Sequence, residues 1–225
     1  MTKLSTHWKQ DFFEQVEPIR LKDPLSHLLG AQDEEEVFVF HYTDAVKLAG
    51  HSCPAVSGAY KVTAKALKAL YGDETPVRGE IKALIKGGPA DLAYGPQAQV
   101  ISLITGASGA TGFKGLGGKY SRRNKLFFDE KNLEFNTFIF QREDTHKTVK
   151  LTYNPQVIPG DARMNGLVPK VLKGSATKEE KEEFINIWQG NVRKILLEDG
   201  KHPGLFTVEE LGDFKFPDSG AKGAY

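Results

Sequence analysis

The sequence predicts an α+β protein whose core runs helix, strand, helix and three strands, followed by a mainly helical C-terminal extension. Three observations predict this class. Over 56–70, apolar residues recur at spacings of four and three. In the next segment, which ends at Ile85, they alternate with polar residues. Between Lys125 and Tyr153 they fill three short runs. The 225 residues, 40% of them hydrophobic, suffice for a buried core and argue against extensive disorder.

The first 36 residues are predicted to form an N-terminal arm, because Pro18 and Pro24 interrupt a weakly helical pattern. The core is predicted to span 37–153 and to begin with a short apolar run at 37–40, which is a strand or a buried segment. Its first helix has clear end signals. Pro54 suits the first helical position, which makes Cys53 the candidate N-cap, and Gly72 ends the apolar stripe.

The rest of the core follows in order. Residues 77–85 are predicted to form a strand, and the glycines and proline at 87–89 break it from a second helix that ends at Thr105. A glycine-rich loop occupies 106–118, and three strands are predicted at 125–129, 133–140 and 148–153. The extension, 154–225, begins with a loop-rich stretch. Thr177 and Glu180 then form a capping box for a helix that ends before Gly200.

Charge and cysteine content narrow the classes of function. There are 30 basic and 29 acidic residues, so the net charge of +1 predicts neither a nucleic-acid nor a membrane partner. The N-terminus lacks the apolar run of a signal peptide, and we therefore expect a cytoplasmic protein. The single cysteine excludes an intrachain disulfide and any zinc site that needs two cysteines from one chain.

That cysteine belongs to the segment 50–54, which is the strongest candidate in the sequence for a chemically active site. At a helix N-terminus, Cys53 would face unpaired backbone N–H groups, which stabilise a thiolate. His51 could then serve with it as a ligand of zinc or another transition metal. Two other interpretations remain open. Cys53 could be a small buried residue beside a hydrogen-bonded histidine, or a nucleophile with His51, His41 or His146 as its base.

The glycine-rich loop and the basic run behind it suggest a ligand site. A phosphate-binding P-loop is excluded, because Phe113 stands where glycine is needed and Tyr120 where serine or threonine is needed. The loop could still let a ligand approach the backbone closely. Cations next to it could clamp a small anion, although a solvated edge is the alternative. The candidate ligand-binding residues are Gly106, Gly112, Lys119, Arg122 and Arg123.

The segment His51-Ser52-Cys53-Pro54-Ala55, followed by Gly58-Ala59-Tyr60, resembles the FmdE family, which takes its name from one component of formylmethanofuran dehydrogenase. The stretch from Ile101 to Gly106 and Gly118-Lys119 are similar to a second family segment. The resemblance covers roughly 43–153. It implies an α+β fold with a mixed sheet, zinc binding and pairing into homodimers.

The sequence departs from the family pattern at several ligand positions. Ala49 stands at the first histidine of the family segment, and Ala107 at a cysteine that follows Gly106. Only His51 and Cys53 carry over, so His41, a residue across a dimer interface or an exogenous ligand would complete the site. We therefore expect a metal-binding protein with a small anionic ligand between the metal and the basic run. A metal-free ligand-binding or regulatory module and a cysteine-nucleophile enzyme are the alternatives.

Overall fold

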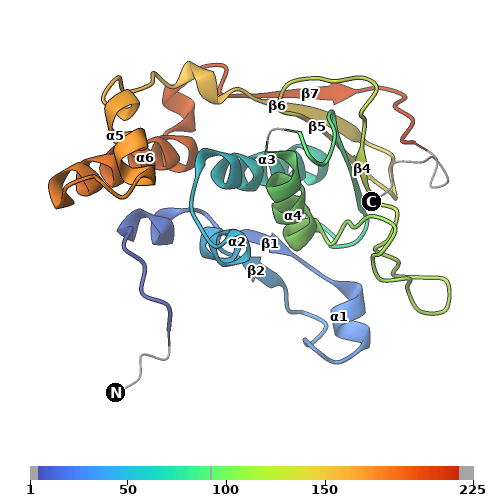
Figure 1. Cartoon of the computed structure of the whole chain (residues 1–225). Coiled ribbons are helices and arrows are strands. Elements are labelled where there is room, and N and C mark those ends of the chain that lie inside the picture. The colour runs from blue at the N-terminus through green and yellow to red at the C-terminus, as the bar shows by residue number, and fades with distance from the viewer. Residues whose placement is uncertain (1–4, 92, 218–225) are drawn as a thin grey trace.

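The computed structural model describes residues 5–91 and 93–217. At its centre is a five-stranded mixed sheet with the strand order β4-β3-β5-β6-β7 (Figure 1). Strands β3 and β4 are parallel, and the other neighbours are antiparallel. The predicted α+β class is confirmed. The strands are β3 (Ile81–Ile85), β4 (Leu126–Phe128), β5 (Thr137–Arg142), β6 (Thr148–Tyr153) and β7 (Phe206–Leu211).

Two predicted helices cover one face of this sheet, α3 (Pro54–Tyr71) and α4 (Tyr94–Thr105) (Figure 1). The apolar stripe predicted for α3 is fully buried from Val56 to Leu70. Gly58 brings this helix close to the sheet, because a Cβ there would overlap the ring of Tyr153 at the end of β6. The predicted order of helix, strand, helix and three strands is therefore confirmed.

The opposite face of the sheet is only partly covered. Leu84, Phe127 and Ile139 form a small separate cluster there. The segment after β7 lies across it, with the rings of Phe127 and Phe216 5.8 Å apart. The C-terminal extension thus contributes to both the edge and the back of the core sheet.

The N-terminal arm packs onto the core through a two-stranded antiparallel sheet of β1 (Ile19–Leu21) and β2 (Phe38–Phe40). Of the two alternatives for 37–40, the structure forms the strand, over Phe38–Phe40. The Tyr60 hydroxyl of α3 donates to the carbonyl oxygens of Glu17 and Phe40, at 3.0 and 2.8 Å. Short helical segments are η1 (Asp11–Gln15), α1 (Pro24–Leu28) and α2 (Tyr42–Ala49).

The extension holds the remaining helices, α5 (Met164–Leu172) and α6 (Lys178–Leu197), with the short turns η2 (Pro155–Val157) and η3 (Asp199–Lys201). The capping box predicted for α6 is confirmed, because Glu180 N–H donates to Thr177 Oγ1 and Thr177 N–H donates to Glu180 Oε2. Within 5–91 and 93–217, no helix has the length and apolar character needed to span a bilayer.

Helix α6 runs beside α3 in the same direction. Its residue Trp188 contacts Ser52 just before α3, and Asp199 just after α6 pairs with Lys61 and Lys65 further along α3. The first ten residues of α6 therefore extend beyond the N-terminus of α3. Together with α5 they form the projecting part of the molecule in Figure 1.

Candidate functional site

Cys53 is the N-cap of α3, as predicted. Its backbone is extended, with φ −150° and ψ 169°, and its carbonyl accepts the Ser57 N–H at 3.0 Å, the first turn of the helix. The residue is only 9% exposed. The thiol therefore lies at a helix N-terminus but just below the protein surface.

Two buried tyrosines flank this thiol. Burial raises the pKa of both Tyr42 and Tyr153, and the proximity of Cys53 raises each pKa further. Both phenols therefore stay protonated and can donate hydrogen bonds. Tyr153 donates to the Pro54 carbonyl at 2.9 Å, and the Tyr42 hydroxyl lies 2.8 Å from Ser52 Oγ. The two residues next to Cys53 in the chain, Ser52 and Pro54, are thus each hydrogen-bonded to a buried tyrosine hydroxyl.

His51 is exposed and has a defined tautomer. Its Nδ1 lies 2.9 Å from the carbonyl oxygen of Ala49. A carbonyl can only accept, so Nδ1 carries the proton, and in the neutral ring Nε2 keeps its lone pair. Metal-binding histidines commonly hold their second ring nitrogen against a backbone carbonyl in this way.

His41, the candidate third ligand, lies at the other end of α2. Its backbone N–H donates to Asp44 Oδ2 at 2.9 Å, at the start of the helix. The eight residues of α2 separate His41 from Gly50 and His51 by about 12 Å of helix rise. Throughout the described part of the chain, no three histidine, cysteine, aspartate or glutamate side chains gather as a metal site. The structure therefore does not unite His41 with His51 and Cys53.

Helix α6 supplies residues of this site that the sequence did not reveal. Trp188 Nε1 and Gln189 Nε2 both donate to the Ser52 carbonyl, at 3.0 and 3.3 Å. Ser52 Oγ in turn donates to Gln189 Oε1 at 3.2 Å. These contacts join residues 136 and 137 positions apart. Local sequence patterns carry no signal for such a distant pairing.

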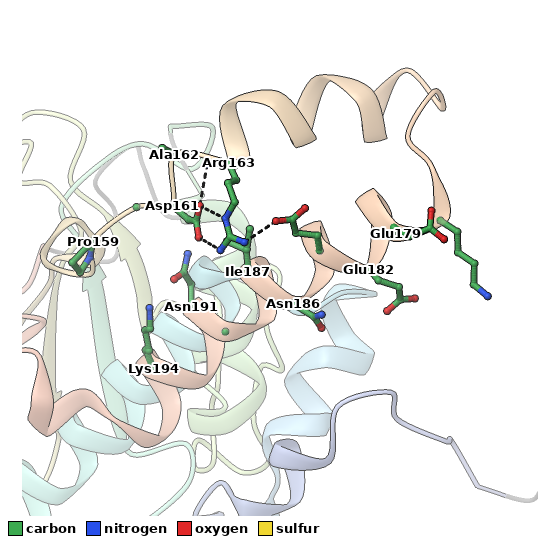
Figure 2. Close-up of a pocket in the computed structure, with 14 residues that line it drawn as sticks. Pro159, Asp161, Ala162, Arg163, Glu179, Glu182, Asn186, Ile187, Asn191 and Lys194 are labelled. Atoms are coloured by element: carbon green, nitrogen blue, oxygen red, sulfur yellow. Dashed lines mark hydrogen bonds and ion pairs between the residues drawn. The ribbon is translucent and has the colours of Figure 1, made fainter.

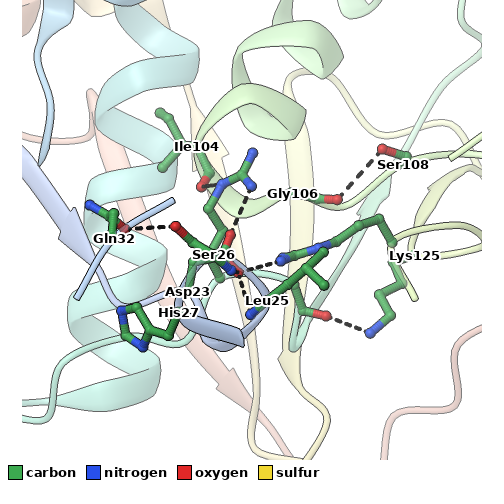
Figure 3. Close-up of polar contacts among 12 residues, drawn as sticks. Asp23, Leu25, Ser26, His27, Gln32, Ile104, Gly106, Ser108 and Lys125 are labelled. Atoms are coloured by element: carbon green, nitrogen blue, oxygen red, sulfur yellow. Dashed lines mark hydrogen bonds and ion pairs between the residues drawn. The ribbon is translucent and has the colours of Figure 1, made fainter. Parts of the chain in front are cut away.

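Arg122, a predicted ligand-binding residue, is instead part of a buried ion cluster around Asp23. Figure 3 shows the polar contacts around Asp23. Arg122 Nη2 donates to Asp23 Oδ1 at 2.6 Å, and Arg78 Nη1 donates to Oδ2 at 3.1 Å. Burial alone would raise the pKa of Asp23, but the two guanidinium groups outweigh it, so the pKa is lowered. Arg78 also donates to the carbonyls of Leu103 and Ile104 at the end of α4.

The glycines of this region are explained by packing. Gly79 and Gly106 have φ of +86° and +75°, and a Cβ on either would press on the Arg122 guanidinium. A Cβ on Gly112 would lie 2.5 Å from Ser108 Cβ. Gly106 and Gly112 thus let the loop fold around Arg122, whose buried Nη1 finds no hydrogen-bond partner among the described residues.

Lys119 and Arg123, the other two predicted ligand-binding residues, are exposed. Lys119 pairs with Leu116 across a tight turn, with both backbone hydrogen bonds at 2.9 Å. Their side chains thus remain accessible to an anionic ligand, in contrast with that of Arg122.

The ion cluster and Cys53 lie at opposite ends of α3. The backbone of Val77, next to Arg78, forms a hydrogen bond with the hydroxyl of Tyr71, which is the last residue of α3. Cys53, in contrast, directly precedes the first residue of α3. The 18 residues of α3 span about 27 Å. One small ligand therefore cannot touch both Cys53 and Arg122. Arg122 therefore does not contribute to a ligand site beside Cys53, and an anionic ligand at Lys119 and Arg123 stays a prediction.

A separate groove of about 990 Å³ runs along α6 between Lys178 and Lys194, beneath the segment 159–163 (Figure 2). Its wall is braced by Arg163, which bonds Asp161 on its own loop and Glu183 on α6. Asn186, Asn191 and Lys194 line the groove along the helix. None of the predicted site residues lines this groove.

No family model matches this chain, and a search of curated proteins finds no match. The resemblance to the FmdE family therefore rests on the quoted residues around His51 and Cys53 and on the glycine-rich segment.

Proposed function

We propose that this protein is an FmdE-like metal-binding domain that holds zinc through His51 Nε2 and Cys53 Sγ. The observation that carries the proposal is the His51 Nδ1 contact with the Ala49 carbonyl at 2.9 Å, which leaves the Nε2 lone pair free two residues before a thiol at a helix N-terminus. A neutral imidazole and a thiolate are the ligand types that zinc prefers.

The donor set fits an open site better than a structural one. Structural zinc sites use four protein ligands, and catalytic sites leave a position for water or substrate. His51 and Cys53 supply two ligands. The others would come from water, a small anion or a second copy of the chain, and we propose a homodimer as the partner state. A bound zinc ion would activate water or polarise a carbonyl.

The chain's own residues hold this pair in place. Tyr153 fixes the Pro54 carbonyl, and the Tyr42 hydroxyl meets Ser52 Oγ, so the residues on both sides of Cys53 are anchored. Both phenols stay neutral because burial raises their pKa. They therefore act as hydrogen-bond donors and do not place a negative charge against a thiolate.

The test is the metal content of the purified protein and of two variants, Cys53→Ala and His51→Ala. The matched control is His27→Ala, because His27 Nε2 also meets a backbone carbonyl, that of Glu36 at 2.9 Å, on a different part of the surface. Metal should be lost from the first two variants and kept by the control. Absence of metal from the wild type, or equal content in all four proteins, would contradict the proposal.

The second candidate is a metal-free binding or regulatory module. It is favoured by the burial of Cys53, which is 9% exposed. On this hypothesis a chelator leaves the labelling of Cys53 by a thiol reagent unchanged. Under the metal hypothesis the chelator accelerates labelling, because it frees the sulfur.

A further inference from the structure

The peptide that precedes Cys53 is fastened to α6. Its carbonyl, on Ser52, accepts from Trp188 Nε1 and Gln189 Nε2. Because the Ser52 hydroxyl proton is directed to Gln189 Oε1, the Tyr42 hydroxyl is the donor in its 2.8 Å contact with Ser52 Oγ. Three hydrogen bonds therefore tie the Ser52 residue to α6.

Trp188 and Gln189 lie at the boundary between two unlike halves of α6. The C-terminal half is anchored, since Val192, Ile195 and Leu196 are fully buried against the core. The N-terminal half projects past α3 together with α5, and its residues are exposed or half-buried. We call α5 and residues 178–189 the cover segment. Among the described residues, it contacts the core through Trp188 and Gln189 and through an exposed ion pair of Glu182 with Lys9.

Gly190 stands between these two halves. A glycine inside a helix lowers the stability of that turn relative to alanine. Nothing lies within 4 Å of a Cβ built at this position, so no neighbour requires a glycine there. The helix is thus weakest at the point where the fastened cover segment meets the anchored half.

We propose that the cover segment is a hinged cover of the Cys53 site, latched by Trp188 and Gln189 on the Ser52 carbonyl and bending at Gly190. Opening releases the Ser52 peptide and gives a ligand access to a thiol that is 9% exposed in the closed form. The inference rests on the proposed function for what Cys53 does. Its own claim concerns access to the thiol and holds with or without metal.

The test is the rate at which iodoacetamide alkylates Cys53 in the presence of a chelator. Since the chain has one cysteine, the label reports this site alone. The unlatched variant carries Trp188→Phe and Gln189→Ala, which keep an aromatic ring and remove the donors. Loss of these three hydrogen bonds predicts alkylation at least about tenfold faster, equivalent to at least about 1.4 kcal/mol.

Gly190→Ala tests the hinge in the opposite direction. Alanine strengthens the helix at this turn and should slow alkylation about fivefold. The matched control is Gly166→Ala in α5, where a Cβ also meets nothing within 4 Å, so the cover segment gains the same helix preference away from the hinge. The control should alkylate at the wild-type rate.

Equal rates in the wild type and the unlatched variant would overturn the proposal, and so would equal rates for Gly190→Ala and Gly166→Ala. If circular dichroism shows that the unlatched variant does not fold, the glycine pair decides. Metal content separates this proposal from the previous one. If the protein contains no metal but the variants change the alkylation rate as expected, the cover proposal stands and the zinc proposal is wrong. If the protein contains metal and all variants alkylate at the same rate, the zinc proposal stands and the cover proposal is wrong.

Discussion

Removing the Asp23 carboxylate should be among the most destabilising single substitutions in this chain. Asp23 accepts from Arg122 Nη2 at 2.6 Å, from Arg78 Nη1 at 3.1 Å and from the N–H groups of Leu25 and Ser26 at 3.1 and 3.4 Å. The side chain is almost completely buried. One carboxylate thus neutralises a buried guanidinium, holds a second one and caps α1.

The magnitude follows from these contacts. Leaving a buried charge without its partner costs about 3–5 kcal/mol, and loss of an N-cap costs about 1 kcal/mol. Arg78 keeps its two carbonyl partners, so Arg122 accounts for most of the loss. Asp23→Ala should therefore lower the free energy of unfolding by about 4–6 kcal/mol. That is a large share of a typical stability of about 5–15 kcal/mol.

The assay is urea unfolding followed by circular dichroism, with Asp73→Ala as the control. Asp73 forms a fully exposed ion pair with Lys68, so its loss should leave the urea midpoint nearly unchanged. Because the folded-state pKa of Asp23 is lowered, its contribution is present above the unfolded pKa of about 3.9 and is lost as the pH falls through the folded value. A loss below about 1 kcal/mol for Asp23→Ala would refute this reasoning.

Four further substitutions test other parts of the structure. Gly79→Ala should lower the free energy of unfolding by more than about 2 kcal/mol, because φ is +86° and the new Cβ would press on Arg122. Gly117→Ala, where φ is +54° and the space is open, should lower it by about 1 kcal/mol. Thermal unfolding measures both. Thr177→Ala removes the cap of α6 and should cost about 1 kcal/mol, seen as a lower urea midpoint. Tyr153→Phe removes the 2.9 Å bond to the Pro54 carbonyl and should cost about 1 kcal/mol. An unchanged urea midpoint in either of the last two would contradict the assigned contact.

The core was predictable because its signals are local. The buried stripe of α3, the proline and glycine at its ends and the strand at 148–153 all lie in continuous sequence. The strand predicted at 133–140 forms instead at Thr137–Arg142, because Leu133 and Phe135 are apolar but exposed and so extended the pattern. Strand β7 was not predicted, since it is an edge strand whose Val208, Glu209 and Glu210 are exposed.

The candidate site was predictable only in part, for the same reason. The position of Cys53 at a helix N-terminus follows from the proline after it. The burial of Arg122 depends on Asp23, 99 residues away, and Trp188 lies 136 residues from Ser52. These pairings are set by the packing of whole elements, and a basic run or an aromatic helix face looks the same in the sequence whether or not it has such a partner.

The measurement that tests the central claim most directly is the zinc content of the wild-type protein beside Cys53→Ala, His51→Ala and His27→Ala. The account predicts stoichiometric metal in the wild type and in His27→Ala, and its loss from the other two variants. Metal-free wild-type protein, or a metal content that ignores Cys53 and His51, would contradict it.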